Sequence, residues 1–185
     1  MKTHRSWYRI ALARPDAPGL LVAAAGEHLG AAIAAAEGMA LVEGDEFHSA
    51  ASREKMRRGI ALTDADREPW LGRLGELLAS HGGGIVLSCS ALKRRYRDIL
   101  RSHVPGLRFA YIEIDLHTAA TRVAARADHL FPRSLVTSQF ATLESPLGED
   151  GVFRVSALVS TEAQVDAIAD WLAPAHALAD TRSLT

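Results

Sequence analysis

The sequence predicts one three-layer α/β domain in which helices cover both faces of a parallel sheet. The chain has 185 residues, the length of a single ordinary domain. Short apolar runs alternate along it with longer segments of helical periodicity, which is the order expected of βαβ units. The run G-I-V-L-S-C is apolar without alternation, as strands buried on both faces are.

Apolar, β-like runs mark the strands of the predicted sheet, which we expect to have about five strands. They are Leu20–Ala24, Ala40–Glu43, Ile85–Cys89, Phe109–Ile114 and Val152–Val155. Helical patterns fill the gaps between them, with apolar residues at i, i+3 and i+4 spacing. They are Leu29–Glu37, Ser49–Arg58, Glu68–Ser80, Lys93–His103, Thr118–Arg126, Ser134–Glu144 and Thr161–Leu172.

The ends of the chain differ from this periodic middle. Residues 1–18 combine charged and aromatic residues with the turn-rich R-P-D-A-P-G, so we expect a loosely ordered leader there. The predicted domain covers residues 19–174, and residues 175–185 form a C-terminal tail.

Composition indicates a cytoplasmic globular protein without a nucleic-acid or membrane partner. Apolar residues make up 48% and charged residues 23% of the chain, and the net charge is −1. No apolar run approaches the ~20 residues that would span a bilayer, and the N-terminus lacks the apolar core of a secretory signal. The single cysteine, Cys89, cannot form an internal disulfide, and we expect it to be a small core residue.

Ligands of open α/β sheets bind beyond the carboxyl ends of the strands, so the residues after each strand are the candidate site. Asp45 follows the second predicted strand in G-D-E-F-H. Its carboxylate is suited to accept a proton from a substrate hydroxyl or to help hold Mg²⁺. The alternative is a turn in which Asp45 caps the next helix. Spacing alone leaves both open.

Two later motifs have structural explanations that are equally good. Thr63 is suited to cap the helix that follows, with Asp64 and Asp66 in its first turn. Lys93 and Arg97, four residues apart, share one helix face and could grip a carboxylate or phosphate. They could equally form an exposed basic face.

Taken together, these segments resemble the gluconokinases, small P-loop kinases that phosphorylate sugar acids. The resemblance rests on G-D-E-F-H, K-M-R-R-G-I-A-L-T-D-A-D-R-E-P-W-L, C-S-A-L-K-R-R-Y-R-D-I-L-R and S-Q-F-A-T-L-E-S-P, and it covers roughly residues 20 to 172. It implies a P-loop kinase-type fold with a small lid, ATP and Mg²⁺ as cofactors, and phosphorylation of D-gluconate to 6-phosphogluconate. A homodimer is a further expectation from the family.

The resemblance also implies residue roles, position by position. Asp45 matches the carboxylate at the substrate hydroxyl and the metal, and Arg126 matches a lid arginine that stabilises the transferring phosphoryl group. His129 matches the start of the lid. The positions that match the sugar-acid side are His48, Lys55, Arg67, Lys93, Arg97 and Gln139.

The phosphate-binding loop departs from the family pattern. The family carries G-x-x-x-x-G-K-S/T between its first strand and first helix, where Lys reaches the phosphates and Ser/Thr ligates Mg²⁺. The corresponding positions here are Ala25, Gly26, Glu27 and His28, and neither of two alignment registers, one residue apart, supplies the Lys, a hydroxyl ligand or the earlier glycines. A carboxylate at Glu27 would repel triphosphate, so we expect phosphoryl transfer to be weak or absent.

Three hypotheses follow. The chain is a weak kinase, a pseudokinase that binds gluconate or a protein partner without transfer, or a poorly folding relic. A shifted reading frame or start upstream of Leu29 would explain the altered loop, and so would gene decay or repurposing.

Overall fold

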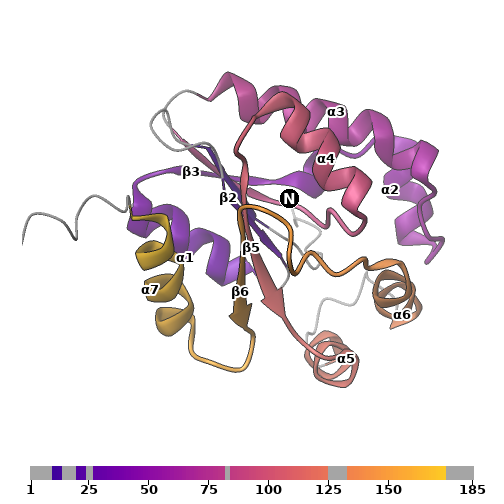
Figure 1. The fold of residues 1–185 in the computed structure, drawn as a ribbon. Coiled ribbons are helices and arrows are strands. Elements are labelled where there is room, and N and C mark those ends of the chain that lie inside the picture. The colour runs from indigo at the N-terminus through magenta and orange to yellow at the C-terminus, as the bar shows by residue number, and fades with distance from the viewer. Residues whose placement is uncertain (1–9, 14–19, 24–26, 82–83, 125–132, 174–185) are drawn as a thin grey trace, which may run out of the picture.

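A computed structural model of the chain describes residues 10–13, 20–23, 27–81, 84–124 and 133–173. These residues form one sheet flanked by helices (Figure 1). The strands are β1 (Ile10–Ala13), β2 (Leu20–Ala23), β3 (Ala40–Glu43), β4 (Ile85–Ser88), β5 (Arg108–Glu113) and β6 (Val152–Ser156). The helices are α1 (Glu27–Glu37), η1 (Gly44–Phe47, a 3-10 turn), α2 (Ala50–Arg57), α3 (Asp64–Ser80), α4 (Arg94–His103), α5 (Leu116–Ala124), α6 (Arg133–Thr142) and α7 (Thr161–Leu172).

The sheet has the strand order β3-β4-β1-β2-β5-β6. The pairs β3–β4, β2–β5 and β5–β6 are parallel, as the alternation of strands and helices predicts. Strand β1 is antiparallel to β4, β2 and β5. The expectation of about five parallel strands is therefore wrong in number, because six strands are described and one runs against the rest.

The extra strand lies inside the segment predicted to be a leader. Ile10–Ala13 is a short apolar run set among charged and turn-forming residues, and that setting concealed it. The remainder of residues 1–18 and the predicted tail at 175–185 lie outside the described residues, so the domain bounds stay a prediction.

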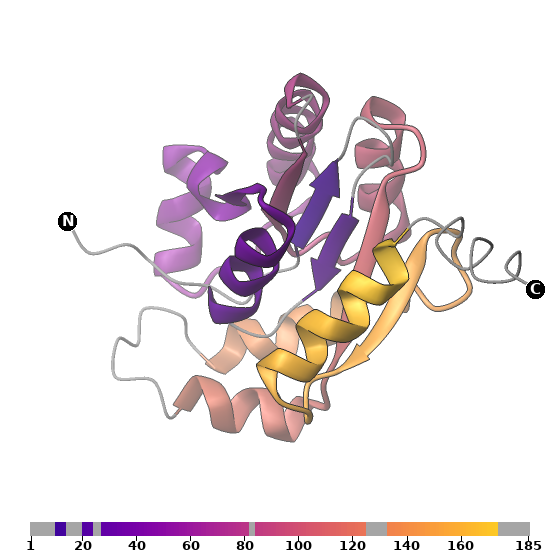
Figure 2. The same ribbon diagram turned by 90° about the vertical axis from the view of Figure 1, so that its left-hand side faces the viewer.

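Helices cover both faces of the sheet and produce two separate cores. Helices α1 and α7 pack together on one face, and α3 and α4 lie side by side on the other (Figures 1 and 2). Strand β4 serves both, since Ile85 and Leu87 join the core under α3 and α4 while Val86 joins the core under α1 and α7. This alternation confirms that the apolar run is a strand buried on both faces.

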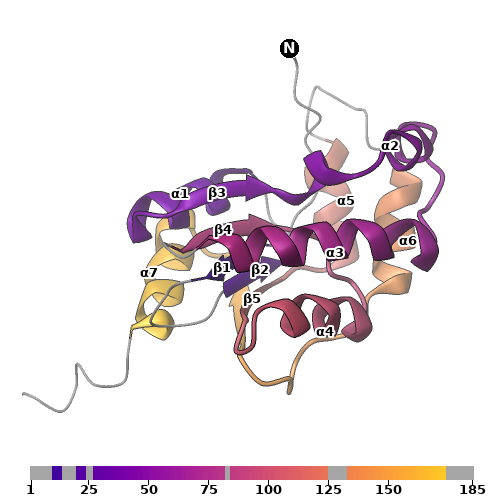
Figure 3. The same ribbon diagram turned by 90° about the horizontal axis from the view of Figure 1, so that it is seen from above.

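Helices α2, α5 and α6 gather beyond the carboxyl ends of the strands, where Figure 3 shows them along one end of the sheet. A small apolar cluster that includes Ala119 of α5 and Val136 of α6 holds the last two together. The predicted lid residues 125–132, between α5 and α6, lie outside the described residues. None of the helices that the structure describes is long and apolar enough to cross a membrane.

Candidate functional site

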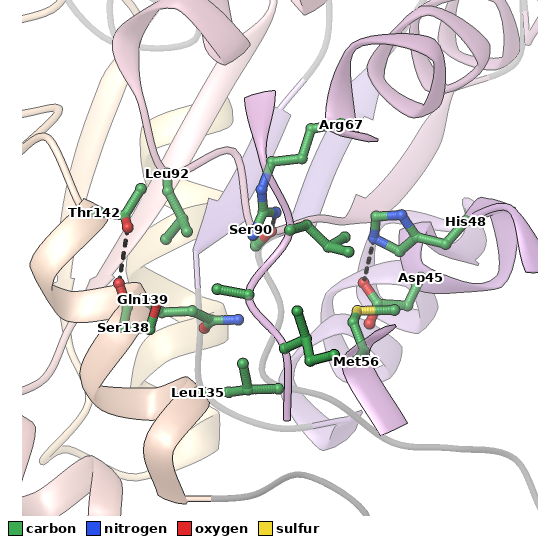
Figure 4. A pocket seen from close by; sticks show the side chains of 13 residues that line it. Asp45, His48, Met56, Arg67, Ser90, Leu92, Leu135, Ser138, Gln139 and Thr142 are labelled. Atoms are coloured by element: carbon green, nitrogen blue, oxygen red, sulfur yellow. Dashed lines mark hydrogen bonds and ion pairs between the residues drawn. The ribbon is translucent and has the colours of Figure 1, made fainter. Parts of the chain in front are cut away.

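A pocket of about 500 Å³, its open mouth included, lies where η1, the α2–α3 connection, the end of β4 and α6 meet (Figure 4). We call it the polar pocket. The residues that line it are Asp45, His48, Met56, Ile60, Ala61, Leu62, Arg67, Ser90, Leu92, Leu135, Ser138, Gln139 and Thr142. Four predicted site residues, Asp45, His48, Arg67 and Gln139, are therefore brought together.

The η1 turn positions Asp45 and His48. Gly44 is buried against β4, and a Cβ at this position would lie 2.5 Å from the carbonyl oxygen of Ser88, so only glycine fits without a shift. The indole Nε1 of Trp70, on α3, donates a 2.7 Å hydrogen bond to the carbonyl oxygen of Gly44. The turn is thus fixed from two sides. Helix α2 is capped by Ser49, so Asp45 does not have the capping role that its sequence position also allowed.

His48 is an uncharged imidazole held in the wall of the pocket. Its ring stacks on Trp70 with a centroid separation of 4.1 Å, and 3% of the residue is exposed. Burial, with a smaller effect of the nearby Arg67 and Arg53 cations, lowers the pKa of His48 to about 3. Its Nε2 lies 3.7 Å from a carboxylate oxygen of Asp45. Its buried Nδ1 has no hydrogen-bond partner among the described residues.

Arg67 is the cation of the pocket. It is 8% exposed, and its Nη1 lies 3.5 Å from the hydroxyl oxygen of Ser90, at the limit of a hydrogen bond. The guanidinium carbon lies 5.9 Å from the centre of the Tyr96 ring. In the described part of the chain its buried Nε has no hydrogen-bond partner. A buried donor without a partner costs about 1–3 kcal/mol, so Arg67 retains capacity for a ligand.

Helix α6 forms the opposite wall. Leu135, Ser138, Gln139 and Thr142 all face the pocket from this helix (Figure 4). Thr142 donates its hydroxyl hydrogen to the carbonyl oxygen of Ser138, at 2.8 Å. The Gln139 amide offers both a donor and an acceptor.

The pocket wall carries one carboxylate, one guanidinium, a neutral imidazole, hydroxyls and an amide, opposite an apolar side formed by residues such as Met56 and Leu62. One guanidinium suits a ligand with one negative charge. The remaining polar groups suit a ligand with several hydroxyls, and the apolar side suits its C–H face. The pocket therefore matches a small polyhydroxylated monoanion.

The structure places the other three predicted sugar-acid residues outside this lining. The Nζ of Lys55 lies 2.7 Å from Asp66, and the Nζ of Lys93 lies 2.9 Å from Asp64. Arg97 is 1% exposed and forms an ion pair with Glu149. These cations join parts of the fold, and their predicted roles in ligand binding stay untested predictions.

Several lining residues were not singled out from the sequence. Ser90 was considered only as a helix-capping residue, although it follows the most apolar strand, a position from which a side chain reaches the ligand edge of a sheet. The apolar Met56, in α2, and Ile60 and Leu62, after it, gave no distinct signal, because apolar residues in or beside a helix usually belong to a core.

A second pocket of about 530 Å³ adjoins the first and shares Ser90, Leu92 and Gln139 with it. It lies between the ends of β4 and β5 and helices α5 and α6. The rest of its lining is mainly apolar, formed by Tyr111, Ile112, Ile114, Ala119, Val136, Phe140 and Leu143. Among the described residues, no charged side chain lines it.

The predicted phosphate-binding positions lie around the start of α1. Ala25 and Gly26 lie outside the described residues, and Glu27 and His28 fall in the first turn of α1. The family pattern G-x-x-x-x-G-K-S/T has Lys and a hydroxyl at such positions, and this sequence has neither there. The predicted loss of the phosphate grip stays a prediction.

The structure says less about the predicted metal-binding and lid residues. Within the described ranges, no group of three or more His, Cys, Asp or Glu side chains is placed to hold a metal ion, so Asp45 would need ligands from elsewhere. Arg126 and His129 lie outside the described residues, and their predicted roles stay untested.

Three comparisons relate this geometry to known proteins. The chain is 45% identical over 117 residues to a gluconokinase of Gluconobacter oxydans, an alignment that covers 62% of this chain and 66% of that protein. It is 36% identical over 148 residues to a gluconokinase of Arabidopsis thaliana, with 71% and 78% covered. A crystal structure of a gluconokinase from Sinorhizobium meliloti superposes with a TM-score of 0.73 at 41% identity, with 83% and 86% covered. No protein-family model matches the chain.

Proposed function

Since the chain belongs to the gluconokinase family, we propose that its polar pocket binds D-gluconate or a closely similar sugar acid. One observation carries this proposal: Arg67 and His48 are both buried in the pocket wall, and each has a ring or guanidinium nitrogen that no described residue pairs by a hydrogen bond. A carboxylate would accept hydrogen bonds from Arg67, and the hydroxyls of the sugar acid would pair with His48 and Asp45.

The reaction that the family implies is ATP-dependent phosphorylation of D-gluconate to 6-phosphogluconate, with Mg²⁺. We propose that this activity is weak or absent here, because the family's Lys and Ser/Thr are missing from the sequence between β2 and α1. Losing one charge-assisted contact costs roughly 1.5–3 kcal/mol, and each 1.36 kcal/mol slows transfer about tenfold. Loss of the Lys and the hydroxyl together would slow transfer by several powers of ten.

The second candidate function follows from the difference between the sugar-acid pocket and the altered phosphate-binding loop. A chain that keeps its sugar-acid pocket but cannot hold Mg-ATP would be a pseudokinase, which binds gluconate or a protein partner without phosphoryl transfer. Cytoplasmic location, expected from the composition, and assembly as a homodimer, expected from the family resemblance, belong to the proposal.

Calorimetric titration of the purified full chain tests the proposal. D-gluconate and Mg-ATP are titrated separately, with D-glucitol, which has the hydroxyls without the carboxylate, as the control ligand. We expect gluconate to bind, glucitol to bind much more weakly, and Mg-ATP to give little heat. Equal binding of gluconate and glucitol would remove Arg67 as the carboxylate partner. Tight Mg-ATP binding would favour an active kinase.

A further inference from the structure

Arg97 is buried, and each of its three guanidinium nitrogens donates a hydrogen bond to another part of the chain. Its Nη1 donates to the carbonyl oxygens of Ala91, at 2.9 Å, and Leu92, at 3.2 Å. Its Nε and Nη2 donate to both carboxylate oxygens of Glu149. Burial alone would raise the pKa of Glu149, but Arg97 and then Arg101 outweigh it and lower that pKa. The ion pair is therefore intact at neutral pH.

A second carboxylate from the same segment holds the same loop. Glu144 accepts a 2.6 Å hydrogen bond from the backbone N–H of Arg94, which opens α4. The backbone N–H of Glu144 in turn donates to the carbonyl oxygen of Leu92, at 2.9 Å. Helix α4 has no side-chain cap from its own N-cap residue, Lys93, so Glu144 takes that function.

These contacts join the two walls of the polar pocket. The loop after β4 carries Ser90 and Leu92, which line the pocket. The segment that supplies Glu144 and Glu149 continues directly from α6, which carries Gln139 on the opposite wall. Fixing one segment on the other thus sets the distance between the walls.

We infer that Arg97, Glu149 and Glu144 form a clamp that positions the Ser90–Leu92 loop against α6 and so shapes the sugar-acid pocket. In this inference, which rests on the proposed function, Arg97 is a positioning residue and does not touch the ligand. A ligand carboxylate would have to displace Glu149 to reach it, because the Arg97 donors already have partners. The ligand contacts instead remain with Arg67, Ser90 and Gln139.

The test replaces the ion pair by apolar residues of similar volume, Arg97→Met with Glu149→Leu. A buried ion pair can often be exchanged in this way without loss of folding, whereas removing one partner leaves an uncompensated charge. Glu144→Gln is a second variant, which weakens the clamp from its exposed edge. Glu54→Gln is the matched control, since it breaks an exposed ion pair with Arg57 on α2, and neither residue lines the pocket.

Two measurements are made on each variant and on the wild-type chain: gluconate affinity by calorimetry, and hydrogen–deuterium exchange of peptides covering residues 88–94. We expect the double variant to bind gluconate at least about tenfold more weakly and to exchange faster in 88–94, Glu144→Gln to show a smaller change of both, and the control neither. Unchanged affinity and exchange in the folded double variant overturn the clamp.

The exchange measurement separates this inference from the proposed function. If the wild-type chain fails to bind gluconate, the proposed function fails, and faster exchange in residues 88–94 of the double variant still supports the clamp. If the wild-type chain binds and the double variant binds equally well, the clamp is refuted while the proposed function stands. A variant that loses affinity with unchanged exchange also refutes positioning by this loop.

Discussion

The sugar-acid side and the nucleotide side of this chain lie on the same edge of one sheet but differ in what they retain. On the first, η1, α3 and α6 bring a carboxylate, a guanidinium, a neutral imidazole and an amide around one pocket. On the second, the sequence from Leu20 to His28 has no Lys, Ser or Thr. The proposal therefore predicts that the two sides differ in function: the first binds its ligand and the second holds Mg-ATP weakly or not at all.

The largest effect is expected from rebuilding the phosphate-binding loop, which would remove the difference between the two sides. Replacing Ala23–His28 by a glycine-rich loop ending in G-K-S-T, with enough residues to wrap the phosphates, should raise ATP-dependent gluconate phosphorylation at least about a hundredfold. A coupled assay for 6-phosphogluconate measures it. The same loop with Lys changed to Met serves as the control. Similar turnover before and after rebuilding would falsify the view that the native connection limits transfer.

On the sugar-acid side, the largest loss is expected from Arg67→Met. Removing a charge-assisted hydrogen bond of about 1.5–3 kcal/mol should weaken gluconate binding roughly ten- to a hundredfold. Calorimetry gives the affinity, and thermal unfolding shows whether the fold persists. Arg57→Met, on the exposed face of α2, is the matched control. If both variants bind gluconate like the wild-type chain, the carboxylate binds elsewhere.

Asp45→Asn should weaken gluconate binding by roughly tenfold, because an amide is a poorer acceptor for a ligand hydroxyl than a carboxylate. The fold should remain intact, since Ser49, not Asp45, caps α2. Affinity and unfolding temperature are measured together. Loss of stability with unchanged affinity would give Asp45 a purely structural role.

The smallest effect concerns the neutral state of His48. Its folded pKa of about 3 lies below the ordinary value of 6.5, so below pH 6.5 the unfolded chain takes up a proton that the folded chain does not. Stability from this group is complete above pH 6.5 and should fall by about 1.4 kcal/mol per pH unit below it. Urea unfolding at pH 7.5 and 5.5 measures this.

His48→Gln should remove that dependence on pH, whereas His117→Gln, at an exposed position on α5, should keep it. An equal loss of stability in the wild-type chain and in His48→Gln would assign the dependence to other groups.

The predictions from sequence that succeeded are those that depend on neighbouring residues in the chain. Patterns that depend on local chain geometry were sound: Thr161–Leu172 is helical over the predicted range, and Thr63 forms the predicted N-terminal cap with Asp66. Strand β1 was missed because four apolar residues in a charged setting are too short a signal. A local sequence pattern predicts where a helix begins, but it does not predict which other element that helix packs against.

Side-chain direction was the harder problem at the site. The spacing of Lys93 and Arg97 is correctly helical, but spacing cannot tell which turn of the helix faces inward, and Arg97 proved to be buried against Glu149, 52 residues later. Partners so distant in sequence leave no periodic signal. Likewise, the stacking of His48 on Trp70 and the closeness of His48 to Arg67 depend on the docking of α3 against η1.

The stacking of His48 on Trp70 also gives the site a built-in optical reporter. Trp70 is 1% exposed, and its indole stacks on the His48 ring in the pocket wall. Trp171 stacks instead on Phe153, on α7 and β6, and belongs to the core under α1 and α7. The third tryptophan, Trp7, lies outside the described residues. In a Trp7→Phe variant, ligand entry should alter the emission of Trp70 while that of Trp171 stays constant, so occupancy of the pocket can be followed by fluorescence without a label.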